Sequence, residues 1–504
     1  MESLKEKTTR GLMWAGMNNV VQQGLGLLIG IVVARKLSRQ DYGMVAMIMI
    51  FSLVANALQE SGFKSALANL KSPRHEDYNA VFWFNVLVGV GCYVVLFLAA
   101  PLIAAFYRTP ELTLLCRVYF LGIVFSCLGT AQSAYLFCNL MVKEQSQCNM
   151  KATVISNLVG LTMALTGCGY WALAVQMLVY IGLNTLLLWH VSAWRPTIPT
   201  TSTTAETNQA PIPSGGAGGG FLSFFAPVRR MFVFSSKLLA TSILERINTT
   251  VMNVLLGRFY TKAEVGDYNQ AYQWSSKVFY LMQGTLQQVA QPVFTNVADE
   301  RERQLRILRK LVRFTAFLSF PMLLGLGLVS EEFIVLTIGE KWIHSAHLLR
   351  LLCLSGAFVP VCSVLTNLLI SRGRSSTYFW VTLCQCVTLV LTVLALRHYG
   401  IRPMVVAYVI IYSLWAFVWH FFVGRLTGYS LLAFVKDVGG FALIALGVMV
   451  LTGMLTSAIS QMWLLLIVRV VVAAALYYMV MRLLHVKILD ECVAFVKGKL
   501  SIKH

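Results

Sequence analysis

The chain has few charged residues for its length, and this scarcity excludes most soluble proteins. Only 12% of its 504 residues are Asp, Glu, Lys or Arg, whereas 57% are hydrophobic. An ordinary soluble domain carries about 25% charged residues. Acidic residues are especially scarce, at 21 against 41 basic ones, and no loop is large enough to form a soluble domain. The composition therefore indicates a protein of the lipid bilayer.

Cysteine and histidine are present, but they lack the spacing of a metal site or a disulfide framework. The eleven cysteines lie mostly within or beside apolar segments, and Cys384 and Cys386 would point to different faces of a helix. We interpret them as small apolar packing residues, and we expect no metal and no cofactor. The start of the chain also lacks a small-residue cleavage site, so we expect no cleaved signal peptide.

Long apolar stretches dominate the sequence, and about fourteen of them are long enough to cross ~30 Å of hydrocarbon as helices. Their continuity favours helices over the short alternating strands of a barrel, so the predicted fold class is all-α. The expected spans are 11–34, 43–66, 80–106, 112–141, 151–167, 170–190, 231–257, 268–295, 314–338, 348–370, 377–396, 403–424, 438–457 and 461–481.

Basic residues are distributed unevenly among the loops between these spans. When both termini are placed inside, most Lys and Arg fall in cytoplasmic loops, which is the positive-inside bias of membrane proteins. The net charge of +20 is then expected to set the topology, and a nucleic-acid partner is not expected. We predict a multi-pass protein of the plasma membrane with both termini in the cytoplasm.

One motif occurs twice, each time just past the end of a long apolar segment. The order of residue types is basic, hydroxyl, basic, acidic and glycine. The two copies are Arg35, Ser38, Arg39, Asp41 and Gly43, and then Arg258, Thr261, Lys262, Glu264 and Gly266. Since the copies follow the first and the seventh expected spans, they predict two homologous halves. Internal repeats of this kind are typical of transporters whose substrate path lies between the repeats.

A stretch rich in Thr, Pro and Gly separates the two copies, and such a stretch cannot bury a core. We therefore predict a six-helix N-terminal lobe at 1–196, a flexible cytoplasmic linker at 197–230, a six-helix C-terminal lobe at 231–424, and two further helices with a basic tail at 425–504. The arginine-rich segment 301–313 has two interpretations: an amphipathic helix on the inner leaflet, or a basic loop leading into the ninth span.

Polar side chains recur inside the first two expected spans of each lobe. Such groups are costly in a bilayer, and they mark pathways or interhelical pairs. The candidates for the lining of a hydrophilic cavity between the lobes are Asn18, Gln22, Asn56, Glu60, Lys64, Lys237, Thr241, Glu245, Arg246, Thr249, Asn253, Gln273 and Lys277. Amides, hydroxyls and cations together suit a large, hydroxylated and anionic substrate. Alternatively, Glu60 with Lys64 and Glu245 with Arg246 are charge pairs that hold helices together.

The end of the first span, Val33 to Gly43, has a V-A-R-x-L-S-x-x-D-Y-G pattern. It resembles the bacterial polysaccharide transporter family, the Wzx-type flippases of the multidrug/oligosaccharidyl-lipid/polysaccharide superfamily. The resemblance covers the whole chain in helix number, lobes and repeated motif. It implies a V-shaped pair of bundles with a cationic lumen.

The resemblance also implies a transporter rather than an enzyme. Such a protein flips a polyprenyl-diphosphate-linked oligosaccharide repeat unit across the bacterial inner membrane by alternating access, for O-antigen, capsule or exopolysaccharide assembly. Its implied partners are this lipid-linked oligosaccharide, membrane lipids, and the polysaccharide polymerase and chain-length machinery. The coupling ion, H⁺ or Na⁺, stays open.

Two other functions stay open at this point. A MATE-like drug/cation antiporter would share the fold, but cationic substrates favour an acidic cavity, and here basic groups outnumber acidic ones on the polar faces. A membrane glycosyltransferase or polymerase usually needs a sizeable outer loop with catalytic acids. The one acidic cluster in an expected outer loop is Glu331, Glu332 and Glu340, within 330–347.

Overall fold

The computed structural model describes residues 22–60, 67, 73–139, 141–198, 226–296, 300–486 and 488–491. Within these residues the chain is helical and has no strand, which confirms the predicted all-α class. Ten helical stretches of the described part are long and apolar enough to cross a membrane. The chain divides between Arg258 and Phe259 into two compact units, and each is described by itself.

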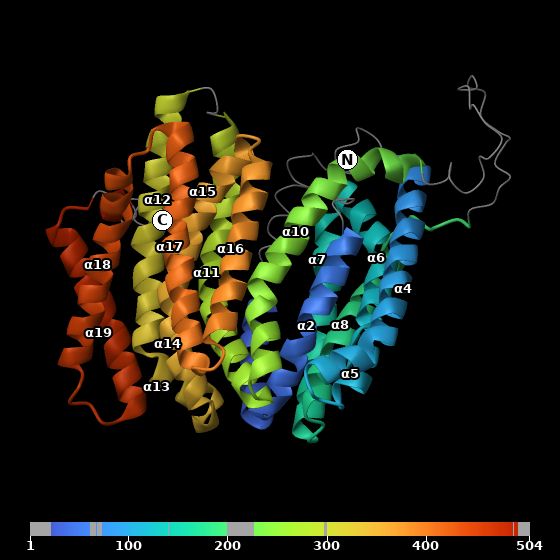
Figure 1. Cartoon of the computed structure of the whole chain (residues 1–504), viewed down its shortest axis with the longest axis horizontal. Coiled ribbons are helices and arrows are strands. Elements are labelled where there is room, and N and C mark those ends of the chain that lie inside the picture. Colours follow the sequence, from blue (N-terminus) through green and yellow to red (C-terminus); the bar gives the residue numbers. More distant parts are fainter. Residues whose placement is uncertain are drawn as a thin grey trace, which may run out of the picture. The chain divides into compact units, whose positions relative to one another are not determined.

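The first unit begins with a helix over 22–36. Its further helices are α2 (Arg39–Glu60), α4 (His75–Phe106), α5 (Leu112–Tyr119), α6 (Leu121–Cys138), α7 (Val142–Leu165), α8 (Tyr170–Val191) and α10 (Ala226–Phe259). α6 packs on both α4 and α8, and α8 packs on α7, as Figure 1 shows. These contacts make α6 and α8 the centre of the unit.

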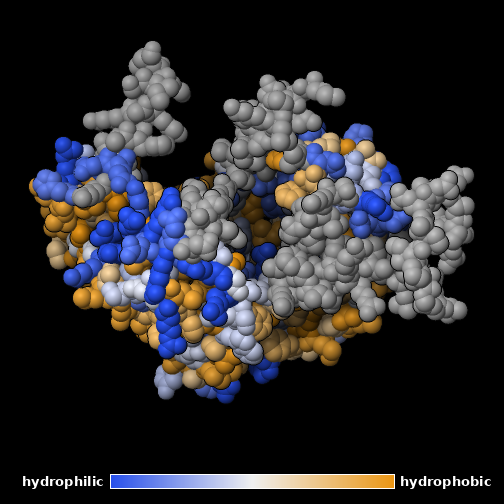
Figure 2. Space-filling view, turned by 90° about the horizontal axis from the view of Figure 1, so that it is seen from above, coloured by the Kyte–Doolittle hydropathy of each residue, from blue (hydrophilic) through white to orange (hydrophobic). Residues whose placement is uncertain are grey.

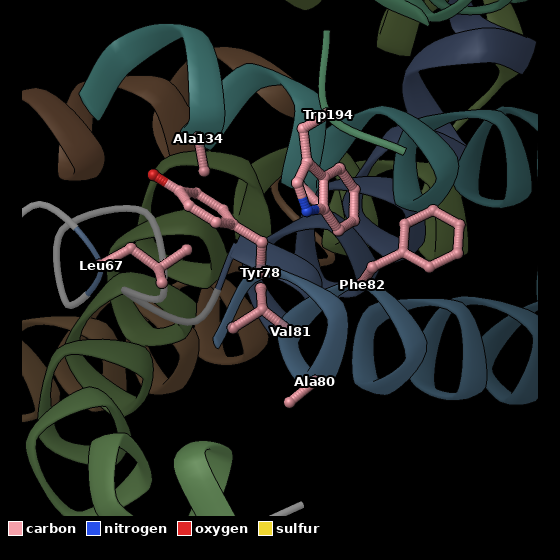
Figure 3. Packing of buried hydrophobic residues seen from close by; sticks show 8 residues of the cluster. Leu67, Tyr78, Ala80, Val81, Phe82, Ala134 and Trp194 are labelled. Atoms are coloured by element: carbon pink, nitrogen blue, oxygen red, sulfur yellow. The ribbon is translucent and has the colours of Figure 1, made fainter. Parts of the chain in front are cut away.

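Aromatic residues pack together in this unit at the start of α4 (Figure 3). Tyr78 and Phe82 of α4 pack against Trp194, which lies in the segment after α8. All three side chains are at least nine-tenths buried. The chain that leaves α8 is therefore held against the start of α4 by apolar burial.

The predicted linker at 197–230 is described only at its two ends. At its start, the Asn79 amide donates to the Thr197 hydroxyl over 3.0 Å and accepts from the Thr197 backbone N–H over 3.0 Å. At the other end, 226–230 belong to α10. Contacts group α10 with the first unit up to Arg258, and the division into lobes at 1–196, 231–424 and 425–504 stays a prediction.

The second unit contains the helices from Lys262 onward. They are α11 (Lys262–Asn296), α12 (Arg301–Leu328), α13 (Ser330–Ile338), η1 (Glu340–Trp342), α14 (Ile343–Gly356), α15 (Val359–Ser371), α16 (Ser375–Leu396), α17 (Ile401–Thr427), α18 (Leu431–Leu455) and α19 (Met462–Leu483). α11 packs on α14 and α15, whereas α12 packs on α18. α18 and α19 form a pair at the edge of this unit in Figure 1.

The flanks of the helices are apolar. Leu98, Leu102, Leu443 and Leu483 are each more than two-thirds exposed. Figure 2 looks onto the helix ends, and it shows hydrophilic residues gathered there with hydrophobic residues around the sides. Apolar flanks meet lipid tails and polar ends meet water, so this is the surface of a multi-pass membrane protein.

Each expected span lies mostly in helix where it is described, with ends that differ by a few residues, but some spans are divided. The expected span 112–141 is split at Phe120 into α5 and α6, and 348–370 is split between α14 and α15. The expected span 314–338 is likewise broken at Val329, between α12 and α13. Periodicity and hydropathy do not locate such breaks, because the residues on both sides are equally apolar.

The arginine-rich segment 301–313 forms the first turns of α12, so the expected helix is confirmed and the alternative of a basic loop was wrong. The segment continues without a break into the rest of α12, and its place at the inner leaflet stays a prediction. Leu308 and Val312 are fully buried, at 0% exposure. Arg309 and Arg313 each lie 2.7 Å from the carboxylate of Asp437 in α18. Apolar burial and a buried counter-charge therefore hold the segment inside the bundle.

Candidate functional site

Both copies of the repeated motif form the same hydrogen-bonded cap at the start of a helix. Before α2, the Asp41 carboxylate accepts from the backbone N–H and the hydroxyl of Ser38 over 2.8 and 2.6 Å, and the Asp41 N–H donates to Ser38 Oγ over 3.2 Å. Before α11, Glu264 and Thr261 repeat these bonds at 3.0, 2.8 and 3.3 Å. This is a capping box, which pairs backbone N–H groups that the first helical turn leaves open.

The other motif residues lie around the same helix starts. Gly43 and Gly266 are buried, each as the fifth residue of its helix. Arg35 is exposed, whereas Arg258 donates to the carbonyl of Phe106 and lies 5.1 Å from its ring. The geometry thus gives the repeated motif a role in the fold of each unit.

Three long helices, α7, α10 and α11, are not among the ten apolar stretches. Many of the polar residues that lie within the expected spans belong to these three helices. Polar residues in spans are costly unless they face a bundle interior or a water-filled cavity. These helices are therefore where a hydrophilic pathway is expected.

The polar residues of α10 differ in exposure. Glu245 and Arg246 are exposed, and Thr241 is half-buried. The hydroxyl of Thr249 donates to the carbonyls of Glu245 and Arg246 over 3.0 and 3.1 Å, so its hydrogen-bond acceptors lie within its own helix. Among the described side chains of α10, Arg246 is therefore an exposed cation that a ligand can reach.

Buried amides add a second kind of polar group in the first unit. Asn56 Oδ1 of α2 and Asn253 Oδ1 of α10 are enclosed and accept no hydrogen bond from a described residue. Three residues after Asn56, Gln59 is fully buried and donates to the Ile123 carbonyl over 2.9 Å. Unpaired buried oxygens of this kind are rare in stable folds, where a partner or a water satisfies them.

Two candidates on α11 belong to the second unit. Gln273 is exposed and donates to Asn269 Oδ1 over 2.5 Å. The Lys277 ammonium lies 4.2 Å from the centre of the Trp274 ring, a cation–π contact. Lys277 is therefore held by its own helix rather than by an acidic side chain that the structure describes.

Four candidates have no described side chain. Asn18 and Lys64 lie outside the described residues, and Glu60 and Lys237 lie in helices whose side chains there are not described. That the polar faces of the two units meet around one cavity stays a prediction, and so does the substrate-binding role of all thirteen residues.

The structure brings Gln22 together with polar residues that the sequence analysis missed. A pocket of about 370 Å³ within the first unit is lined by Gln22, Thr153, Asn157, Gln176 and Tyr180, among others. Its residues on α7 and α8 are uncharged, so they did not stand out as costly groups. The signal in the sequence was the polar content of the expected span 151–167, which holds Thr153, Ser156 and Asn157.

A larger cavity of about 670 Å³ lies within the second unit, between α12, α18 and α19. Its lining is almost wholly apolar, with Phe317, Met449 and Tyr477 among the contributors. Arg469 is the one charged residue among the described residues of this lining, and its guanidinium is 2.6 Å from Glu332 of α13. The pair is largely buried, so the cavity presents an apolar surface with its charge already neutralised.

Among the described residues, no group of three or more His, Cys, Asp and Glu side chains is placed to hold a metal ion.

The fold and its polar helices define the class of protein: a multi-pass membrane protein with the fold of the MOP superfamily transporters. The lipid II flippase MurJ superposes with a TM-score of 0.69 at 14% identity, over 94% of this chain and 99% of that one. An inward-facing multidrug resistance MATE family transporter of the MOP superfamily superposes with a TM-score of 0.60 at 14% identity, over 83% of this chain and 99% of that one.

The chain belongs to the polysaccharide biosynthesis protein family, whose model matches residues 32–207 and 223–347. It is 26% identical to the lipopolysaccharide biosynthesis protein WzxC of Escherichia coli, over 74% of this chain and 71% of that protein. It is 23% identical to the succinoglycan biosynthesis transport protein ExoT of Rhizobium meliloti, over 75% of this chain and 72% of that protein. The resemblance seen at Val33 to Gly43 is therefore confirmed.

Proposed function

We propose that this chain flips a polyprenyl-diphosphate-linked oligosaccharide repeat unit across the bacterial inner membrane for surface polysaccharide assembly. Membership of the polysaccharide biosynthesis protein family carries this proposal. The names of WzxC and ExoT connect such chains with lipopolysaccharide and with succinoglycan transport. The fold shared with a lipid II flippase agrees with a substrate that is part lipid and part sugar.

The chemistry of the described residues suits such an amphipathic substrate. Exposed Arg246 and the polar faces of α7, α10 and α11 offer charge and hydrogen bonds to a diphosphate and to sugar hydroxyls. The apolar cavity of the second unit offers a place for part of a polyprenyl chain. Alternating access, cytoplasmic termini and association with a polymerase or chain-length machinery belong to the same proposal.

The MATE-like alternative shares the fold, as the superposition with a MATE transporter indicates. Fold likeness at 14% identity does not transfer a substrate. The family match concerns polysaccharide biosynthesis, and basic Arg246 and Lys277 on the polar helices disfavour a cationic drug. Flipping is therefore the better supported function, and it requires no catalytic residue.

Deletion of the gene, followed by sidedness labelling of the lipid-linked oligosaccharide and a surface glycan blot, tests the proposal. We expect repeat units to accumulate on the cytoplasmic leaflet, and the full chain supplied in trans to restore delivery. Outward delivery with unpolymerised glycan would instead indicate an enzyme. An unchanged surface together with greater drug sensitivity would indicate a drug exporter.

Bulky substitutions in the apolar cavity test the place of the lipid chain. Ala474 lines this cavity and the adjacent Ala475 does not, although both side chains are exposed. We expect Ala474→Trp to lower delivery of repeat units several-fold by filling the cavity, and Ala475→Trp to leave it unchanged. Equal delivery by both variants at equal abundance would remove the cavity from the substrate path.

A further inference from the structure

The pocket of the first unit lies among the helix 22–36, α7 and α8. Its described lining consists of Gln22, Thr153, Ser156, Asn157, Leu173, Gln176, Met177 and Tyr180. Its volume of about 370 Å³ lies within the range of ~300–1,000 Å³ that is usual for small-molecule sites. α7 and α8 are joined by a short turn at 166–169. The pocket is thus built on two helices whose relative position is closely constrained.

The polar side chains of the pocket form one connected network. Gln176 Nε2 donates to Asn157 Oδ1 over 3.0 Å, and Asn157 Nδ2 donates to the Thr153 carbonyl over 2.7 Å. Gln22 Nε2 donates to Thr153 Oγ1 over 3.3 Å. The network holds the amides in place before any ligand arrives, which lowers the entropy cost of binding.

This network leaves hydrogen-bonding capacity unused. Gln176 Oε1 accepts no hydrogen bond from a described residue, although an amide oxygen has two lone pairs. The hydroxyl of Ser156 donates to the Thr153 carbonyl over 3.1 Å and keeps its acceptor sites. Gly160 allows the Gln176 side chain to approach, because a Cβ at Gly160 would lie 2.5 Å from Gln176 Oε1.

The lining also sets the charge of the ligand. None of the described lining residues is an Asp, Glu, Lys, Arg or His. A diphosphate would lack a cation here, and a metal or drug cation would lack a carboxylate. Alongside the amides, Leu173, Met177 and the Tyr180 ring offer apolar surface. Hydroxyls on an edge and C–H groups on a face are the surface of an uncharged sugar ring.

We propose that this pocket binds an uncharged sugar ring of the oligosaccharide during transport. The inference rests on the proposed function, and it adds that different residues bind the charged and the uncharged parts of the substrate. The cationic candidates on α10 and α11 take the anionic part of the substrate, whereas Thr153, Asn157 and Gln176 take neutral hydroxyls. The pocket therefore contributes to selection among repeat units that carry the same diphosphate lipid.

Photocrosslinking tests occupancy directly. Met177 lines the pocket, and Leu186 on the same helix is 68% exposed and lies outside it. Each is replaced in turn by p-benzoylphenylalanine in the full chain, in cells fed a tritiated neutral hexose. After irradiation we expect glycosidase-releasable tritium on the Met177 variant and background on the Leu186 variant. Equal labelling of both, or none at Met177 in a variant that still delivers glycan, overturns the proposal.

A pair of threonines in α7 provides a matched functional test. Thr153 and Thr162 each donate to the carbonyl four residues earlier, over 2.8 and 2.5 Å, but Thr162 does not line the pocket. We expect Thr153→Val to lower delivery of repeat units about two- to tenfold, as for the loss of one hydrogen bond. Thr162→Val should deliver as the unchanged chain does.

The two tests separate this inference from the proposed function. If the unchanged chain fails to restore delivery to the deletion strain, the proposed function is wrong and the pocket has no sugar to bind. If the unchanged chain restores delivery but Thr153→Val and Asn157→Leu both match it at equal abundance, flipping stands and the sugar subsite is rejected.

Discussion

Arg469 of α19 and Glu332 of α13 form an ion pair of 2.6 Å in which the two side chains are only 18% and 7% exposed. The guanidinium also donates to the Thr456 hydroxyl over 3.2 Å. One side chain thus joins α19 to α13 and to the end of α18. A buried pair of this kind contributes less through attraction than through the penalty that follows when one partner is removed.

Arg469→Met is therefore expected to lower the free energy of unfolding by about 3 kcal/mol, because Glu332 stays buried without its counter-charge. Adding Glu332→Gln should recover most of that loss. A double-mutant cycle measured by thermal denaturation of the purified full chain in one detergent checks this. Additive effects of the two substitutions would show that the pair does not act as a unit.

The pairing of Arg469 illustrates what the sequence can and cannot predict. A base deep inside an apolar span is visible in the sequence, but its partner lies 137 residues away. Helix type and approximate helix ends follow from local hydropathy, so the expected spans correspond to helices wherever they are described. Which helices touch depends on packing between distant segments, and no local pattern contains that information.

The repeated motif shows the opposite case. Ser38 with Asp41 and Thr261 with Glu264 have the spacing of a capping box in the sequence, and the hydrogen bonds form as that spacing requires. The uncharged pocket on α7 and α8 was missed because Thr153 and Gln176 resemble ordinary packing residues when viewed one at a time. Only the fold places them in one network with Gln22.

Two glycines in the turn between α7 and α8 provide the second prediction. Gly167 and Gly169 have positive φ angles of 82° and 56°. A Cβ at Gly167 meets nothing within 4 Å, whereas a Cβ at Gly169 would lie 2.9 Å from Asp41 Oδ1. Gly167→Ala should cost about 1–2 kcal/mol from backbone strain alone. Gly169→Ala should cost more, because it also displaces the Asp41 carboxylate.

Thermal denaturation of both glycine variants checks this order. Asp41→Ala alone is expected to lower the free energy of unfolding by about 1 kcal/mol. If the displaced cap causes the extra loss in Gly169→Ala, the double variant should lose less than the sum of the two single losses. Equal losses in the two glycine variants would mean that the cap at α2 does not depend on this turn.

The third prediction concerns Asp437, whose side chain is 0% exposed between Arg309 and Arg313. The Tyr429 hydroxyl donates to it over 2.8 Å, and burial raises the pKa of Tyr429, so this hydroxyl stays protonated. Asp437→Asn should lower the free energy of unfolding by about 1.5–3 kcal/mol through loss of charge-assisted hydrogen bonds.

Lys310 is the matched control for that substitution. It lies in the same helix as Arg309 and pairs with Glu491 over 2.7 Å, but both side chains are more than half exposed. Lys310→Gln should change the free energy of unfolding by at most about 1 kcal/mol, because water screens the pair. Melting temperatures of the two variants in the same detergent make the comparison, and equal shifts would refute a special role for the buried pair.

The last prediction concerns the cations proposed to attract the diphosphate. Arg246 is exposed on α10, and Lys237 lies in the same helix. A charge-assisted contact with phosphate contributes about 1.5–3 kcal/mol, so removing both side chains as Lys237→Ala, Arg246→Ala should lower delivery of repeat units by at least ~100-fold. Arg246→Lys keeps the charge and should lower delivery much less than Arg246→Ala does.

Arg306 is exposed on α12, and its substitution by Ala is a control that removes a positive charge elsewhere. The measurement is sidedness labelling at equal abundance, and undiminished delivery by the double variant would exclude charge attraction by these residues. In that event the binding energy would have to come from the neutral amides and the apolar cavity alone.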